Sequence, residues 1–309
     1  MTSAILVASL LTIIGAATPL LLAALGELVA ERAGVLNLGV EGMMLAGAVM
    51  GFAVMAITGS GTLGIVVAAI AGASMALLFG VLTLSLLANQ VATGLALTIF
   101  GIGLSALIGA GFVGSPVDPL PKLDIPGLST IPVIGPILFA QDFLVYFSWL
   151  MTAAVAWFLT RTRSGMILRA VGESHDAAHA IGYPVIRIRY MAVAFGGAMA
   201  GLGGAYLSLA YTPQWVENMS AGRGWIALAL VVFAAWRPWR AFIGAYLFGG
   251  VTIIQLSAQT SGIVDVPAQV MSMLPYLATI LVLVIISAGP WRGRLNAPAC
   301  LGQPFRATA

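Results

Sequence analysis

Residues 62–87 read TLGIVVAAIAGASMALLFGVLTLSLL and carry no charged side chain. A helix needs about 20 apolar residues to cross the hydrocarbon core of a bilayer, so this stretch predicts a membrane-spanning helix. The whole chain has the same character: of its 309 residues, 61% are hydrophobic and 7% are charged, and its mean hydropathy is +1.06. So few polar side chains cannot coat a water-soluble globule, which excludes a soluble enzyme or binding module.

Nine apolar runs approach or exceed the length that crosses a membrane. They cover residues 3–25, 34–57, 62–87, 91–114, 139–160, 190–211, 223–236, 239–257 and 268–289, and the seventh is short. The runs are continuous rather than alternating, which excludes β-barrel strands. Glycine pairs four residues apart, at Gly47 and Gly51 and at Gly197 and Gly201, have the spacing of close helix contacts. The sequence predicts an all-α polytopic membrane protein of about nine helices (eight to ten), with residues 1–309 in a single transmembrane domain.

Arginines indicate the orientation of these spans. They gather in the loop 161–189, around the turn 236–239 and in the C-terminal tail, which all fall on one side. The connections on the other side hold a single basic residue, Lys122. Because basic loops stay in the cytoplasm, we expect the loop 161–189 and the C-terminus there, and the N-terminus outside. The loop 114–138, stiffened by six prolines, is then an external surface.

Several kinds of chemistry are not indicated. There is no phosphate-binding G-x-x-x-x-G-K-[ST] loop, so if the protein moves a solute uphill, nucleotide hydrolysis must come from a partner. The net charge of +3 reflects arginines at the ends of spans, not a nucleic-acid surface. The single cysteine, Cys300, excludes an intrachain disulfide and a thiolate metal site. His175 and His179 lie four apart in the inner loop, and we interpret them as part of a polar docking helix rather than a zinc site. No catalytic residue and no metal ligand is predicted.

Asn37 and Glu41 interrupt the second apolar run and would share one face of a helix. A carboxylate within a span marks a substrate path or a partner by default. The alternative is that Glu41 ties helices together or pairs with an arginine such as Arg32. Asn89 and Gln90 lie between two runs, where a polar helix cap is the favoured interpretation.

The inner loop contains a predicted helix from Ala170 to Ile181, closed by Gly182 and Pro184. Its alanines permit close approach of another protein. Arg169 and Glu173, four residues apart, have the spacing to fix its orientation by ion pairing. We interpret this helix as a docking element, and the alternative is an ordinary solvated loop.

At four segments the sequence resembles the transmembrane permeases of bacterial ABC importers of the ribose/galactose/nucleoside type. These segments are Leu36-Asn-Leu-Gly-Val-Glu-Gly-Met-Met-Leu45, Ala88-Asn-Gln-Val-Ala-Thr-Gly-Leu-Ala-Leu97, Arg169-Ala-Val-Gly-Glu173 and Glu217-Asn-Met-Ser-Ala-Gly-Arg-Gly-Trp-Ile-Ala-Leu228. The first resembles the nucleoside branch, since sugar-branch members usually show an Asp-Leu-Ser type of sequence there. Ser174-His175 departs from the Asn-Pro of many relatives, which we expect to alter the helix start without abolishing docking.

The resemblance implies the ABC importer permease fold and a multi-pass place in the bacterial inner (plasma) membrane. It also implies a second permease subunit, often a different paralogue, an extracytoplasmic solute-binding protein and a cytoplasmic ATPase that holds ATP and magnesium. The chain itself would bind no cofactor and would not be an enzyme; beyond these proteins it meets membrane lipid and no nucleic acid. The inner helix would be the coupling helix that sits in the ATPase cleft. Its predicted coupling residues are Arg169, Gly172, Glu173, Ala177, Ala178 and Gly182.

The cargo implied by the nucleoside branch is a nucleoside or a related riboside. Residues that provide polar groups or soft apolar walls for it are the predicted substrate pathway: Asn37, Glu41, Met43, Met44 and Asn89. A simple-sugar ABC permease is the main alternative. An ion-coupled secondary transporter is less favoured, because Glu41 alone is a clear acidic residue within the predicted spans. An intramembrane enzyme lacks a serine–histidine pair or twin aspartates within the spans.

Overall fold

The computed structural model describes residues 2–124, 126–129, 131–260 and 297–306, with six single positions between 267 and 284. Its helices in chain order are α1 Thr2–Arg32, α2 Val40–Thr58, α3 Gly61–Gly80, α4 Gln90–Gly109, α5 Ile134–Phe139, α6 Phe143–Arg161, α7 Arg163–Glu173, α8 His175–Ala180, α9 Val185–Tyr206, α10 Arg223–Phe233 and α11 Pro238–Thr260. Three short helical segments continue these helices: the π-helical η1 Val81–Ser85 follows α3, the 3-10 helix η2 Ala110–Phe112 follows α4, and the π-helical η3 Leu207–Tyr211 follows α9. Two strands, β1 Lys122–Asp124 and β2 Ala140–Asp142, pair antiparallel.

Short polar side chains explain where several helices begin. Asn89, Asp142, Thr162 and Ser174 each precede a helix, and each side-chain oxygen accepts a backbone N–H from the first turn. Such caps satisfy donors that no carbonyl within the helix can reach. The polar-cap interpretation of Asn89 is therefore confirmed, because its Oδ1 accepts the N–H of Ala92 at 3.0 Å.

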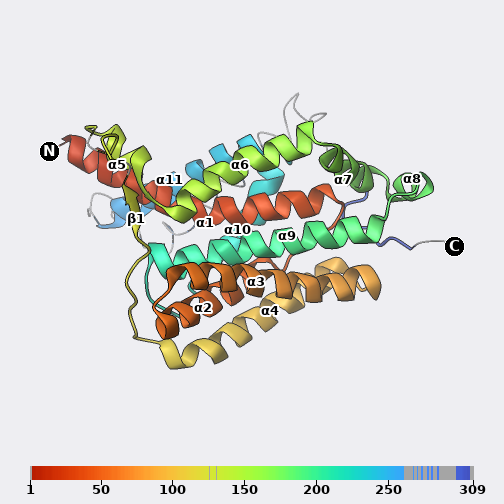
Figure 1. The fold of residues 1–309 in the computed structure, drawn as a ribbon, viewed down its shortest axis with the longest axis horizontal. Helices are drawn as coiled ribbons and strands as arrows, with labels where there is room; N and C mark the ends of the chain where they lie inside the picture. The colour runs from red at the N-terminus through yellow and green to blue at the C-terminus, as the bar shows by residue number, and fades with distance from the viewer. Residues whose placement is uncertain are drawn as a thin grey trace.

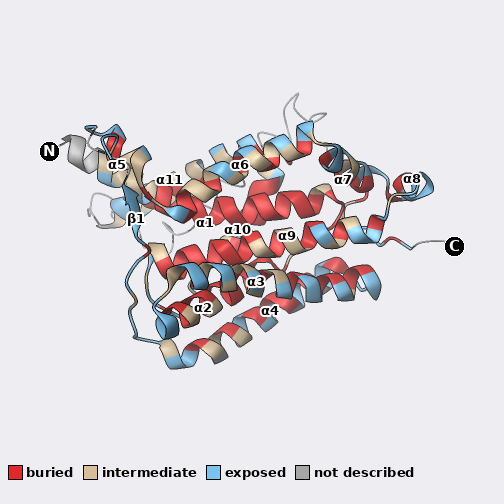
Figure 2. Cartoon of the chain, viewed as in Figure 1, coloured by how far each residue is buried: buried red, intermediate tan, exposed pale blue. Residues whose placement is uncertain are grey.

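The long helices lie side by side along the longest axis of the molecule (Figure 1). Helix α9 occupies the middle and packs on α1, α2 and α3, while α4 lies against α2, and α6 and α11 lie against α1. Figure 2 shows the burial that results, with α1 and α9 buried along most of their length. The outer helices leave large apolar side chains exposed, among them Ile99 and Leu107 on α4. Such a surface suits contact with lipid or another membrane subunit, and it confirms the all-α polytopic class.

Seven helices are long and apolar enough to cross a membrane within the described part of the chain. The short seventh run corresponds to α10, which has 11 residues and is not among the seven. The predicted run 268–289 falls almost wholly outside the described residues. The predicted count of nine is therefore not confirmed.

Two predicted boundaries are wrong. The first helix continues beyond residue 25 to Arg32, and the second begins at Val40 rather than 34. The charged side chains Glu27 and Glu31 mark the predicted break, but both are buried within α1, with exposed fractions of 1%. Their oxygens accept hydrogen bonds from within the chain, which offsets the cost of removing them from water.

Glycines bring α9 into direct backbone contact with α2 and α3. A Cβ atom on Gly201 would overlap the carbonyl oxygen of Ala68, and one on Gly47 would overlap the backbone of Gly201. Gly197 faces Gly72 in the same way. Small residues let membrane helices approach closely enough for extensive van der Waals contact. The predicted packing role of the spaced glycine pairs is confirmed.

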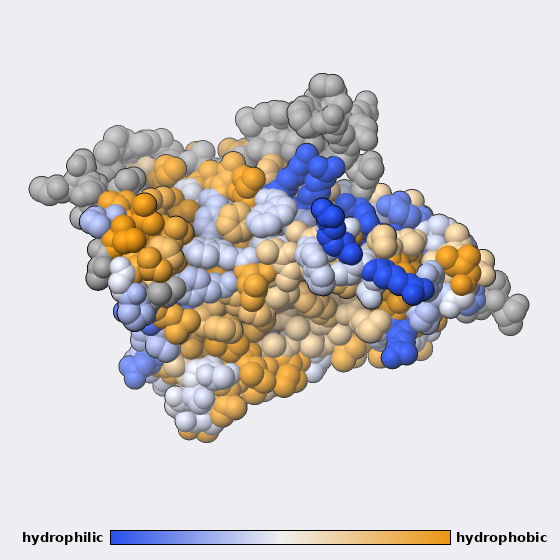
Figure 3. All heavy atoms as spheres, turned by 45° about the horizontal axis from the view of Figure 1, so that its top comes forward, coloured by the Kyte–Doolittle hydropathy of each residue, from blue (hydrophilic) through white to orange (hydrophobic). Residues whose placement is uncertain are grey.

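The connecting loops divide between the two ends of the bundle as the arginine pattern predicts. At one end the loop 114–138 meets the segment 212–222, since Val113 bridges Trp215 and Pro116 bridges Gln214. The start of α1 lies at this end, against α5. At the other end lie the loop 161–189, the turn 236–239 and residues 297–306. Figure 3 shows strongly hydrophilic residues gathered toward this second end, which we call the inner end.

Candidate functional site

The inner end carries a projection built from two helices, α7 and α8. The predicted single helix is interrupted at Ser174, which has an extended backbone (φ −154°, ψ 96°), so one continuous helix is wrong. Its hydroxyl accepts the N–H of Ala177 at 3.3 Å and starts α8 as a new helix. Gly182 ends the projection with φ +90°, a conformation that glycine adopts without steric cost. The expected change at Ser174-His175 is therefore a break between two helices, and the side chain of Ser174 caps the second one.

The predicted coupling residues divide between two faces of this projection. Glu173, Ala177 and Gly182 are exposed, and Arg169 is half-buried. Gly172 and Ala178 are buried, and a Cβ on Gly172 would overlap the carbonyl oxygen of Arg32. The structure therefore brings Gly172 and Ala178 against the chain itself, while Ala177 and the neighbouring Ile181 face outward.

Residues 297–306 lie across the base of the projection. The N–H of Cys300 donates to the carbonyl of Gly172 at 2.9 Å, and the N–H of Gly302 donates to the carbonyl of Gly34 at 3.2 Å. Arg189, with an exposed fraction of 1%, joins three segments there. Its guanidinium donates to the carbonyls of Ala33 at 3.2 Å and Gln303 at 3.0 Å, and it lies 3.2 Å from Nδ1 of His175. The projection is therefore fastened to the bundle by the chain's own C-terminal segment.

The two histidines of α8 pack on an aromatic ring. Phe305 makes edge-to-face contacts with both His175 and His179, at centroid distances of 5.2 and 5.3 Å. No group of three or more residues suited to hold a metal ion occurs within the described ranges. Burial and the nearby charge of Arg189 lower the pKa of His175 from its ordinary value, against the opposing effect of Asp176. Histidines packed edge-to-face on an aromatic ring fit the docking-helix interpretation of this pair.

Glu41 links α2 to α10. Its Oε1 accepts the hydroxyl of Ser220 at 2.5 Å and the N–H of Gly222 at 2.8 Å, and its Oε2 accepts the N–H of Gly224 at 2.6 Å. The carboxyl group thus caps the N-terminus of α10, where the helix dipole favours negative charge. Glu41 therefore links helices, which is one of the alternatives stated for it above. The other partner considered there, Arg32, donates instead to the carbonyl of Trp236.

The remaining predicted pathway residues lie near Glu41 in the packed interior, apart from Asn89. Asn37 precedes α2 instead of sharing a helical face with Glu41, so that expectation is wrong. Its Oδ1 accepts the N–H of Gly39 at 2.9 Å, and its Nδ2 lies 3.4 Å from the sulfur of Met43. Met43 and Met44 are fully buried. The structure brings these four residues together and places Asn89 at the separate start of α4.

Sequence reasoning missed two buried acids and a tryptophan near the inner end. Glu27 accepts the N–H of Asn37 at 3.0 Å, and Glu31 accepts the indole N–H of Trp236 at 2.5 Å. Glu41 is therefore not the only acid within the spans. The signal was present in the four-residue spacing of Glu27 and Glu31, which places both on one helical face beside an apolar run. Arg189 offered a weaker signal, as an arginine at the edge of a span.

The described part of the chain is thus a bundle of membrane-length helices with a two-helix projection fastened at one end. The chain belongs to the family described as the permease component of branched-chain amino acid transport systems, whose model matches residues 9–284. It is therefore an ABC transporter permease and a multi-pass membrane protein. The resemblance drawn from its motifs is confirmed at this level.

Relatives named for transport functions match nearly the whole chain. A protein of Haloferax volcanii, provisionally named a glucose ABC transporter permease, is 43% identical over 311 residues, which is 94% of both chains. A nucleoside ABC transporter permease of Lactococcus lactis is 33% identical over 93% of both chains. A guanosine ABC transporter permease of Bacillus subtilis is 32% identical over 94% of this chain and 93% of its own. No solved structure matches the chain.

Proposed function

We propose that this chain is one of two permease subunits of an ATP-driven importer that carries nucleosides or related ribosides across the bacterial inner membrane. The observation that carries the proposal is the α7–α8 projection at the inner end of this chain, which belongs to a permease family. Its base is fixed by Gly172, Arg189 and the segment 297–306, while its tip is exposed. A projection that transmits movement from a partner to the spans needs both properties, because a loosely attached base would move without displacing the spans.

The proposed partners rest on membership of the permease family and on the ABC transporter relatives. The sequence shows no phosphate-binding loop of its own, which is consistent with a separate ATPase. ATP and magnesium would be held by a separate cytoplasmic ATPase that receives the projection in its cleft. The inner end would then face the cytoplasm, together with the C-terminus. An extracytoplasmic binding protein would deliver the cargo at the opposite end, where the loop 114–138 and the segment 212–222 pair. Alternating access would open the route to each face in turn.

Bulky substitutions at the exposed tip test the coupling role. Ala177→Trp and Ala180→Trp place a large side chain on the exposed face of α8. In the complete transporter we expect uptake to fall by about tenfold or more, with normal membrane insertion and continued ATP hydrolysis. Ala153→Trp, at an exposed position of α6 away from the projection, is the matched control and should leave uptake unchanged. Full uptake by both tip variants would contradict the coupling role.

Gly172 and Ala178 are unsuitable positions for this test, although they belong to the predicted coupling residues. A bulky side chain at either position would disturb the chain's own packing. We propose that these two residues support the projection from within the chain. Its contact face would include Ala177 and Gly182, and Arg169 and Glu173 would flank that face.

The pathway role of Asn37, Glu41, Met43, Met44 and Asn89 remains a proposal. In this conformation the first four are buried, so a cargo would reach them only if α2 moves relative to α10 during transport. Glu41→Gln should then reduce uptake by about tenfold while the protein inserts normally. Ser220→Ala, which removes one hydrogen bond from the same carboxyl group, is the control for loosened packing. Wild-type uptake by Glu41→Gln would leave only the helix-tying role.

The second candidate cargo is a simple sugar, because the Haloferax relative is named for glucose. Competition experiments separate the two cargoes in cells that produce the complete transporter with its binding protein. Excess unlabelled nucleoside should abolish uptake of labelled nucleoside, and excess glucose should not affect it. Uptake of labelled glucose that nucleosides do not inhibit would replace the nucleoside proposal by the sugar one. Uptake that persists without ATP would contradict both.

A further inference from the structure

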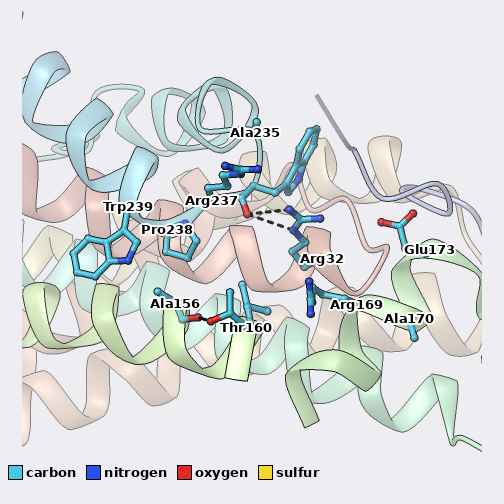
Figure 4. Close-up of a pocket in the computed structure, with 12 residues that line it drawn as sticks. Arg32, Ala156, Thr160, Arg169, Ala170, Glu173, Ala235, Arg237, Pro238 and Trp239 are labelled. Atoms are coloured by element: carbon cyan, nitrogen blue, oxygen red, sulfur yellow. Dashed lines mark hydrogen bonds between the residues drawn. The ribbon is translucent and has the colours of Figure 1, made fainter. Parts of the chain in front are cut away.

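A cavity of about 580 Å³ opens at the inner end between α1, α6, α7 and the turn that joins α10 to α11 (Figure 4). Its charged lining consists of three arginines, Arg32, Arg169 and Arg237, and one acid, Glu173. Figure 4 shows the three guanidinium groups gathered in one part of the cavity. A volume of this size is typical of sites that bind small molecules or headgroups.

The positive charges in this cavity exceed the negative ones. The guanidinium of Arg32 is close enough to those of Arg169 and Arg237 for mutual repulsion. Two acids oppose it, Glu173 in the lining and Glu31 beside Arg32 on α1, so the three arginines still outnumber the acids. Like charges gathered at a partly buried site cost free energy unless an anion lies between them. The sum of charges therefore favours an anionic ligand.

The hydrogen bonds of the arginines leave donors available. Arg32 donates from Nε and Nη2 to the carbonyl of Trp236, at 3.3 and 3.2 Å. The Nε of Arg169 is buried and has no hydrogen-bond partner in the part of the chain that the structure describes. A buried donor without a partner is costly, and an oxygen-rich anion would satisfy it. Arginine forks match the geometry of phosphate oxygens.

The position of the cavity indicates where such an anion would come from. It lies where α6 ends at Arg161 and α11 begins at Pro238, which is the boundary of two candidate spans. Trp239 lines the cavity and is 56% exposed, as is common for tryptophan at the level of lipid headgroups. Basic pockets between membrane helices at the cytoplasmic side are suited to phospholipid headgroups.

We propose that this cavity binds a phosphate group, supplied by the headgroup of an anionic phospholipid, between Arg32, Arg169 and Arg237. The bound group would join α1, α7 and the turn before α11. Because Arg169 belongs to α7, the lipid would fix the base of the projection to the membrane helices. This site is independent of which cargo the permease carries.

Lipid retention by the purified full-length chain tests the proposal. The chain is placed in nanodiscs of phosphatidylglycerol mixed with phosphatidylcholine, and the lipids that remain bound are counted by native mass spectrometry. We expect the chain to retain phosphatidylglycerol, with retention falling by about tenfold in the variant Arg169→Gln/Arg237→Gln. Arg163→Gln, an exposed position at the same end that does not line the cavity, is the matched control.

A second arm separates a lipid phosphate from free phosphate. Inorganic phosphate is added to the chain in neutral detergent, and the shift of its thermal unfolding midpoint is measured. If phosphate raises the midpoint of the wild type but not of the double variant, the site binds free phosphate. If the double variant loses phosphatidylglycerol and phosphate shifts neither midpoint, the site binds lipid. Either result supports a phosphate site. Equal lipid retention by the double variant and Arg163→Gln, with no phosphate effect, would overturn the proposal.

Discussion

At the scale of single residues, Glu41 shows how a carboxyl group can be kept inside a membrane bundle. Three donors, the Ser220 hydroxyl and the N–H groups of Gly222 and Gly224, surround its two oxygens. A Cβ on Gly224 would overlap the backbone of Glu41, so glycine is needed for this approach. The sequence Gly222-Arg-Gly224 thus allows the N-terminus of α10 to approach the buried carboxyl group of Glu41.

Replacing Glu41 by alanine should destabilise the protein by about 2 to 3 kcal/mol, because three donors, two of them buried, lose their acceptor. The thermal unfolding midpoint of the purified chain in detergent measures this effect. Glu217→Ala, at an exposed position, is the matched control and should change the midpoint little. Equal midpoints for the two variants would contradict the helix-tying role.

His175 predicts a pH dependence for the contact of residues 297–306 with α8. Its pKa is lowered on folding, by burial first and by Arg189 second, while Asp176 at 3.5 Å opposes the shift. The unfolded segment therefore binds the proton more tightly than the folded one. The docked state is most stable above the ordinary pKa of 6.5, and it loses stability as the pH falls through that value toward the lowered one.

Hydrogen-exchange protection factors of the 297–306 amides, corrected for intrinsic rates, measure this effect between about pH 7.5 and about pH 5.5. We expect protection to fall toward the acid end in the wild type. His175→Gln cannot titrate and should show little change over the same range. Protection that rises as the pH falls would show that the sign of the pKa shift is wrong.

At the scale of helices, apolar runs predicted the existence of the spans, and buried polar groups decided their ends. The runs placed α3, α4, α6, α9 and α11 within a few residues. The break between α1 and α2 was misplaced because Glu27 and Glu31 look like a boundary until their partners, the N–H of Asn37 and the indole of Trp236, are seen. Those partners lie 10 and 205 residues away, and the distant one leaves no mark in local sequence.

The glycine face of α9 provides a test at this scale. Gly201→Ala should lower the unfolding midpoint, because the added Cβ would overlap the carbonyl oxygen of Ala68 and push α3 away. Gly103→Ala on α4 is the matched control, since no atom lies within 4 Å of its added Cβ. That variant should leave the midpoint unchanged or raise it, because alanine favours helix more than glycine. A Gly201→Ala midpoint equal to that of the control would contradict the close contact.

At the scale of the whole molecule, charge and composition predicted which loops share an end. The arginine-rich loop 161–189 and the turn 236–239 both line the cavity at the inner end, and residues 297–306 bond to Gly172 at the same end. The sequence also predicted a docking helix there, and Asn89 as a cap. It did not predict the role of the C-terminal segment, because the contacts of Cys300 and Gly302 are made by backbone groups. Backbone hydrogen bonds depend on the path of the chain rather than on residue type.

The central claim is that the α7–α8 projection faces the cytoplasm, where an ATPase can drive it. Cysteine labelling with a membrane-impermeant maleimide tests this directly in a Cys300→Ala background, which removes the one cysteine of the sequence. Ala177→Cys reports on the projection and Ser115→Cys on the opposite end, and both positions are exposed. We predict that Ser115→Cys is labelled in intact spheroplasts and that Ala177→Cys is labelled only after the membrane is permeabilised. Labelling of Ala177→Cys from outside intact spheroplasts would contradict the account.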